Sequence, residues 1–407
     1  MHENEQRDRL LQLGCDLGAI QDLDILMERI LTEARTFVHA DAGSIYIREK
    51  NTLRFAYTQN DTLQKNLPED EKLLYTSFTL PIDDRSIAGY VALHNKALCI
   101  DDVYQIPETA PYRFSRSFDI RARYRSRSMY TLPLRDINQK VLGVLQILNP
   151  RGQESPVRPF RNKDTRILKH FASIASLALE RASLTRSILL RMIQMAEMRD
   201  PKETGAHVNR VASYSVLLYE AWAKRRGMDK IVIERQRDRL RMAAMLHDVG
   251  KVAIPDGILK KPGRLTEEEF DTMKTHTFHG AKLFLDVHSD FDHAAAEVTL
   301  THHERWDGRG YPGHIDIATG LALPEKTGEN GKILGLKGEE IPIFGRIVAL
   351  ADVYDALSHQ RVYKKAWEEE RVLEVIREGA GSQFDPELVE IFFDILDVFQ
   401  QISQRFP

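Results

Sequence analysis

The spacing of apolar residues divides this chain into a first part with strands and a second part that is largely helical. Seven apolar positions between Leu23 and Val38 recur at helical spacing, and polar and apolar residues alternate in four later stretches. The elements expected are a helix over 23–38 and strands over 44–48, 53–57, 129–134 and 141–148. We therefore predict an α+β domain, an antiparallel sheet with flanking helices, over residues 1–160.

A long helix is predicted next, over residues 161–199, after a loop rich in Pro, Gly and Arg. Its apolar positions follow steps of three and four, as in a heptad repeat: Leu168, Phe171, Ala175, Ala178, Ala182, Thr185, Leu189, Met192 and Ala196. This stripe could pack on its own domain or form a parallel dimeric coiled coil. We favour the dimer, because the helix joins two regions of different composition.

Helical patterns dominate from Pro201 onward, with short strand signals only between residues 310 and 337. We predict an all-α domain over residues 200–407. The chain is thus expected to be multidomain, with a long helix linking the two domains.

Composition narrows the functional classes. A net charge of −3 lacks the basic surplus of a DNA-binding protein. Cys15 and Cys99 are far apart in sequence, so neither a disulfide framework nor a cysteine zinc site is expected. The N-terminus is charged, and no apolar run approaches the ~20 residues of a membrane span. We expect a cytoplasmic protein without membrane insertion.

Histidines and carboxylates in the second half of the chain suggest a multinuclear metal site. The candidate ligands are Glu203, His207, His247, Asp248, His276, His302, His303 and Asp352. Eight donors exceed what one ion can use. Imidazoles and carboxylates without thiolates suit Fe, Mn, Co, Ni or Zn. Two ions about 3.5–4 Å apart can promote hydrolysis of a phosphoester.

Each of these residues has an ordinary interpretation as well. Glu203 could be an acid that favours the start of a helix, and Asp352 could make a local hydrogen bond. His276 could be unremarkable, with His279 as a nearby decoy. Lys251 could neutralise a phosphate oxygen or lie in solvent. The adjacent pairs His247–Asp248 and His302–His303 lift the set above chance.

Two motifs in this region resemble known signatures. The sequence HDVGK at 247–251 resembles the signature of the HD phosphohydrolase superfamily, and HHERWDGRGYP at 302–312 resembles that of its HD-GYP branch. The resemblance covers roughly residues 190–400. It implies hydrolysis of cyclic di-GMP to linear pGpG, with GMP left open as a further product. The alternatives are another cyclic dinucleotide or nucleotide as substrate, or a receptor without catalysis.

The HD-GYP resemblance also assigns roles to residues by position. It makes the eight candidate donors metal ligands, with Asp248 bridging, and it makes Asp248 and Lys251 catalytic. Glu203 matches the carboxylate that marks trinuclear iron members, so two or three divalent ions are implied, iron first and manganese as the alternative. The positions matching dinucleotide contacts are Tyr311, Arg361 and Lys364. An insertion over residues 313–335 departs from the family pattern and could form a surface hairpin or a lid.

The first part of the chain resembles a GAF sensor domain over roughly residues 15–180, through the order of its helix, strand pairs and closing hairpin. This implies an unidentified small-molecule ligand and a homodimer formed through this domain and the long helix. Asn95–Lys96 matches part of a cyclic-nucleotide pattern, but Phe118–Asp119 breaks the remainder. A cluster of arginines over 113–127 is either a solvated basic loop or a site for an anionic ligand or partner.

Overall fold

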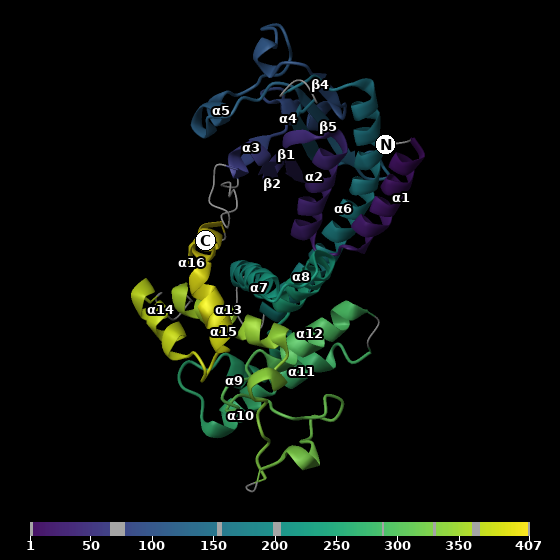
Figure 1. Ribbon diagram of the computed structural model, residues 1–407. Coiled ribbons are helices and arrows are strands. Elements are labelled where there is room, and N and C mark those ends of the chain that lie inside the picture. Colours follow the sequence, from purple (N-terminus) through teal and green to yellow (C-terminus); the bar gives the residue numbers. More distant parts are fainter. Residues whose placement is uncertain are drawn as a thin grey trace. The chain divides into compact units, whose positions relative to one another are not determined.

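The computed structural model describes residues 3–65, 78–152, 157–197, 205–286, 289–328, 331–359 and 367–405. It divides into two units, Met1–Arg186 and Ser187–Pro407, each described here by itself (Figure 1). Glu203, Arg361 and Lys364 lie outside the described residues.

The N-terminal unit is built on a six-stranded antiparallel sheet with the order β3-β2-β1-β6-β5-β4. Its strands are β1 (Ala40–Glu49), β2 (Thr52–Asn60), β3 (Thr79–Pro81), β4 (Leu98–Ile100), β5 (Met129–Arg135) and β6 (Val141–Pro150). Its helices are α1 (Glu3–Ala19), α2 (Leu23–Val38), α3 (Asp61–Gln64), α4 (Ile87–His94), α5 (Ser117–Ala122) and the first part of α6 (Asn162–Glu197), with the short 3-10 helix η1 (Val103–Gln105). The predicted α+β fold is confirmed.

Alternation along β1 places successive side chains on opposite faces of this sheet. Ile45 and Ile47 belong to a core that also contains buried residues of α1, α2 and α6. Tyr46 lies in a second core with Phe55 of β2 and Val91 of α4. Each face of the sheet is therefore covered, and the register shifts only at Ile45/Tyr46 of the β1–β2 pair and at Leu134/Arg135 of the β5–β6 pair among the described strands.

Residues of the heptad stripe of α6 are buried in the cores of the two units between which the helix is divided. Leu168, Phe171 and Ala182 are fully buried in the core of the N-terminal unit, and Leu189 is buried in the core of the C-terminal unit. These positions are thus occupied by intramolecular packing, which is the interpretation that the sequence analysis ranked second. Dimerisation stays a prediction that this stripe does not support.

The described part of the C-terminal unit is helical, as predicted. Its long helices are α7 (Gly205–Arg225), α8 (Lys230–Met245), α12 (Asp290–Thr301) and α13 (Ile343–Ser358). Shorter helices are α9 (Asp256–Leu259), α10 (Glu267–Lys274), α11 (His276–Lys282), α14 (Glu369–Glu378), α15 (Pro386–Asp394) and α16 (Leu396–Arg405), with 3-10 helices η2 (Val249–Ala253), η3 (Pro324–Lys326) and η4 (Gly338–Glu340). The strand signals near 310–337 correspond to two isolated bridges.

An aromatic cluster anchors the C-terminal helices on α7 and α13. Tyr214 stacks on Phe399 with ring centroids 4.5 Å apart, and Tyr354 meets both Tyr214 and Phe392 edge-on. Burial of such rings is a large part of the stability of a helical core.

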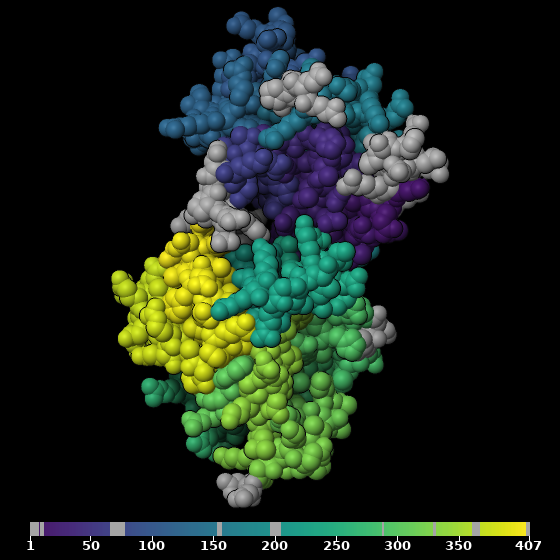
Figure 2. Space-filling view, in the orientation of Figure 1, coloured from purple at the N-terminus to yellow at the C-terminus, as the bar shows by residue number. Residues whose placement is uncertain are grey.

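The space-filling view shows both units in the same colours (Figure 2). Over the described residues, no helix is both long and apolar enough to cross a membrane.

Candidate metal centre

The candidate ligands of the C-terminal unit lie mainly where helices begin or end. α7 starts at Gly205, α8 ends at Met245, α11 starts at residue 276, α12 ends at Thr301, and α13 supplies one carboxylate from its interior. The seven donors that the structure describes are His207, His247, Asp248, His276, His302, His303 and Asp352. Helix ends allow side chains from four segments to converge without a clash between helix backbones.

These donors form two groups, and within each group the ligand atoms lie within 4.8 Å of one another. One group is Asp248, His276, His302 and His303, and the other is His207, His247 and Asp352. The structure therefore brings together all of the predicted ligands that it describes. Their role as ligands stays a prediction.

Asp248 connects the two groups. Its Oδ1 lies 3.2 Å from Nε2 of His276, whereas its Oδ2 lies 3.2 Å from Nε2 of His247. Burial by itself would raise the pKa of Asp248, but Lys251 and His247 hold that pKa well below its usual range. The side chain is thus an anionic carboxylate with one oxygen facing each group, as a bridging ligand requires.

Hydrogen bonds fix the imidazoles with Nε2 facing the cluster. Nδ1 of His247 donates to the carbonyl of Ala244 at 2.8 Å, and Nδ1 of His276 donates to that of Met273 at 2.8 Å. Nδ1 of His302 donates to Val298 at 3.0 Å. A carbonyl can only accept, so the proton must be on Nδ1 and the Nε2 lone pair is left for a ligand. Metal-binding histidines are commonly oriented in this way.

The donor set fits divalent metal ions. Nε2 of His276 and of His302 and Oδ1 of Asp248 are buried and make no hydrogen bond to the residues described. Burial lowers the pKa of His302. The pKa of His303 is lowered well below its usual value by burial and by the neighbouring His302 and His276. The rings are therefore neutral, which is the form that binds metals. Buried polar atoms without partners cost free energy, which a bound cation would offset.

His207 is oriented by a carboxylate that the sequence analysis missed. Its Nδ1 lies 2.8 Å from Oδ2 of Asp355, and Arg210 binds both oxygens of the same carboxylate at 2.6 and 2.9 Å. Burial would raise the pKa of Asp355, but hydrogen bonds from His207, His359 and Arg210 hold it well below its usual range. A sequence signal existed: Arg210 follows His207 by three residues, and Asp355 follows Asp352 by three, so each pair shares a helix face.

Family comparisons agree with this division. Residues 204–357 match the HD domain family, and residues 22–179 match the GAF domain family. The chain combines a GAF domain with an HD domain. HD domains form a fold of metal-dependent phosphohydrolases, in accord with the His/Asp cluster.

The chain is similar to several curated phosphodiesterases. A cyclic di-GMP phosphodiesterase of Vibrio cholerae is 40% identical over 228 residues, covering 54% of this chain and 42% of the relative. One from Thermotoga maritima is 38% identical, covering 51% and 49%. A 3'3'-cGAMP-specific phosphodiesterase 2 of Vibrio cholerae is 35% identical, covering 57% and 39%. The chain spans about half the length of the curated relatives it matches.

A cavity of about 340 Å³ opens beside the histidines of the HD domain. Tyr311, a predicted substrate contact, lies in its wall with its ring centroid 4.9 Å from that of His303. Other lining residues were not identified from the sequence, among them Phe270, Lys274 and Gln383. They precede or follow the motifs by many residues, so only the fold brings them to the cavity.

Lys251 lies at the edge of the cluster rather than in solvent. Its Nζ donates to Oδ2 of Asp248 at 2.7 Å, and its side chain is 18% exposed. This contact places a positive charge beside the carboxylate that joins the two groups. Its predicted role toward a phosphate oxygen is consistent with that position and stays a prediction.

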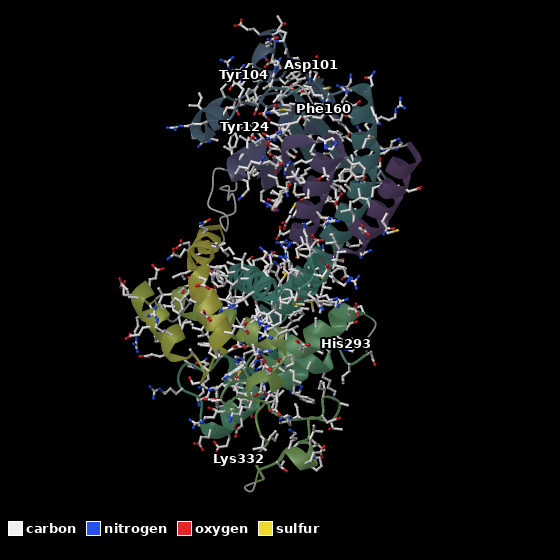
Figure 3. The ribbon with its side chains drawn as sticks, viewed as in Figure 1. Asp101, Tyr104, Tyr124, Phe160, His293 and Lys332 are labelled. Carbon is white, nitrogen blue, oxygen red and sulfur yellow. The ribbon has the colours of Figure 1, made fainter. Side chains whose placement is uncertain are left out.

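The insertion at 313–335 is folded and tied to the metal region at its base. The buried carboxylate of Glu304 accepts from the backbone N–H of Gly313 at 2.6 Å and from that of Leu336 at 3.2 Å. Farther out, Gly320 packs on Phe278 of α11, where a Cβ would lie 2.8 Å from a ring carbon. Lys332 of this segment is labelled in Figure 3. None of the described residues that line the cavity belongs to the insertion, which favours the surface hairpin over the lid.

The GAF domain contains a cavity of its own, of about 370 Å³. Tyr46 and Phe55 of the sheet and Tyr124 line it, together with Arg113 and Arg121 of the arginine cluster; Tyr124 is labelled in Figure 3. The guanidinium of Arg113 also donates to backbone carbonyls of its own loop. The cavity gives the predicted small-molecule input a place to bind, while the ligand stays a prediction.

Proposed function

We propose that this protein is a metal-dependent phosphodiesterase that hydrolyses cyclic di-GMP. The observation that carries the proposal is the placement of Asp248, whose two carboxylate oxygens face two separate groups of donors. Similarity to cyclic di-GMP phosphodiesterases supports the choice of substrate.

Two bound divalent ions would supply Lewis acidity for hydrolysis of a phosphodiester. The chain contributes orientation and charge. His207, His247 and Asp352 would hold one ion, and His276, His302 and His303 the other, with Asp248 between them. Lys251 brings a cation to the edge of this site, where it can neutralise a non-bridging phosphate oxygen. Tyr311 forms the adjoining wall of the cavity.

The second candidate substrate is 3',3'-cGAMP. A relative that is 35% identical carries that specificity in its name. The two dinucleotides differ in one base, so the cluster itself does not distinguish them. A substrate panel is therefore part of the test.

The test uses anaerobically purified full chain, loaded separately with Fe(II), Mn(II) or Co(II). Cyclic di-GMP and 3',3'-cGAMP are incubated with each form, and products are separated by chromatography. We expect linear pGpG from cyclic di-GMP and loss of turnover in Asp248→Asn. Absence of turnover with all three metals, combined with tight binding, would instead indicate a receptor. Preference for 3',3'-cGAMP would replace the proposed substrate.

Glu203 adds a question of stoichiometry. We propose that it supplies the ligand for a third ion, with iron as the metal and manganese as the alternative. Elemental analysis should give three metals per chain, falling to two in Glu203→Gln. Two metals in both proteins would reduce Glu203 to an acid at a helix start. Arg361 and Lys364 remain proposed substrate contacts, and control of turnover by a GAF ligand in a homodimer remains a proposal as well.

A further inference from the structure

An aromatic and basic surface of α10 faces the cavity beside the histidines. Phe270 and Lys274 line this cavity together with His303 and Tyr311. α10 ends at Lys274, directly before His276 begins the next helix, so the position of this surface is tied to that of a candidate ligand. Nothing in the proposed chemistry uses either α10 side chain.

Phe270 offers a partly exposed aromatic ring. Its side chain is 46% exposed, and its ring centroid is 6.3 Å from that of Tyr311 at an interplanar angle of 78°. Tyr311 in turn lies at 30° to His303. Exposed phenylalanine in a concave wall is typical of a surface that a ligand covers. An aromatic ring in this position can stack on a nucleobase of either kind.

Lys274 places a cation near the same two rings. Its Nζ is 4.7 Å from the centroid of Phe270 and 5.9 Å from that of Tyr311, and it donates to Asp271 at 2.7 Å. Asp271 is exposed, so this ion pair is screened by solvent and can exchange for another anion. Arg309 lines the same cavity and adds a second cation.

The chemistry of a cyclic dinucleotide requires such a surface. The molecule has two phosphodiesters and two bases, and only one phosphodiester can react at the cluster at a time. The second phosphodiester and a base must then lie elsewhere in the cavity. The exposed ring of Phe270 and the ammonium of Lys274 match these two groups in polarity and charge.

We propose that Phe270 and Lys274 bind the non-reacting half of a cyclic dinucleotide, the ring by stacking on a base and the ammonium by pairing with the second phosphate. The proposal rests on the proposed function, because it names substrate contacts for the same site. It makes both residues determinants of substrate affinity rather than of the chemical step.

The test compares Phe270→Ala and Lys274→Met with a matched control, Lys282→Met. Lys282 lies 5.5 Å from the ring of Phe278 on α11, and neither residue of this similar pair lines the cavity. Steady-state kinetics are measured with the metal-loaded full chain on the cyclic dinucleotide and on methyl 4-nitrophenyl phosphate. The latter is a phosphodiester that has neither a base nor a second phosphate.

We expect Phe270→Ala to raise KM for the dinucleotide about 5- to 100-fold, the range for loss of one stacked base. Lys274→Met should raise it roughly 5-fold, and both should leave kcat and the small phosphodiester nearly unchanged. An equal loss of kcat/KM on both substrates, or an unchanged KM for the dinucleotide, would overturn the roles proposed for Phe270 and Lys274 but would leave the proposed function standing. A wild-type protein that cleaves only the small phosphodiester would overturn the proposed function, and this inference with it.

Discussion

Replacing Asp355 by Asn tests how the metal site is positioned. Asp355 is 1% exposed and accepts hydrogen bonds from His207 and from Arg210, itself 5% exposed. Asparagine keeps the shape but has only one acceptor oxygen and no charge. His207 loses the anion that fixes its ring, and Arg210 loses the carboxylate that binds its guanidinium.

The two losses have different magnitudes and different readouts. Removing an outer-shell partner of a metal-binding histidine typically lowers metal affinity about 10- to 100-fold, which is about 1.4–2.7 kcal/mol. Leaving a buried arginine without its carboxylate costs about 3–5 kcal/mol of folding free energy. We therefore expect weaker metal binding and a lower free energy of unfolding in Asp355→Asn.

The assay combines metal titration under anaerobic conditions with denaturant unfolding of the metal-free protein. The matched control is Asp385→Asn. Asp385 is also buried and binds Arg346 at 2.7 Å, and its side chain makes no hydrogen bond or ion pair to the candidate ligands that the structure describes. It should lower stability without changing metal affinity. If Asp355→Asn proves too unstable, the double variant Asp355→Asn/Arg210→Met removes the unpaired guanidinium of Arg210. His207 still lacks the carboxylate that orients its ring in this variant.

The positioning argument would be refuted by full metal affinity in a folded Asp355→Asn protein. It would also be refuted if Asp385→Asn lowered metal affinity equally, because the effect would then follow from general destabilisation. Only a loss confined to Asp355→Asn links the carboxylate to the orientation of His207.

Two further variants probe burial and packing in the HD domain. Burial raises the pKa of Glu297 to about 7 from 4.5, so the folded state holds its proton more tightly. The contribution of Glu297 to stability should therefore fall by about 1–3 kcal/mol as pH rises from about 4.5 to 7, so over this range the wild type should lose about that much free energy of unfolding relative to Glu297→Gln, as urea unfolding of both proteins at each pH would show. Gly250→Ala should lower the free energy of unfolding by about 1–3 kcal/mol or more, because the added Cβ would lie 1.9 Å from the carbonyl oxygen of His276. Gly257→Ala, with open space around it, is the control, and equal melting temperatures for the two variants would contradict this packing.

The sequence predicted which donors would cluster largely because four of them belong to motifs at helix ends. His247 and Asp248 end an apolar run, and His302 and His303 end another, so their placement follows from local pattern. Asp355 was missed because its partners lie on α7, 145 and 148 residues away, and only tertiary packing brings them together. Phe270 was missed for the same reason.

The sheet and the long helix show the same limit. Alternation predicted both strand pairs, but it carried no information on the pairing of β1 with β6, which are adjacent in the sheet and about 100 residues apart. The heptad stripe of α6 suggested a partner helix. A stripe of this kind reports only that one face is buried, and Leu168 and Phe171 are buried by their own unit.

Glu304 closes the insertion into a loop. One carboxylate holds the amides of Gly313 and Leu336, so the segment between them is closed at its base like a loop on a fixed stem. Farther along, a Cβ added at Gly331 would have no heavy atom within 4 Å beyond its chain neighbours. An affinity tag or a fluorophore introduced there would report on the protein while the histidines keep their places, which makes this segment a natural attachment point for labelling.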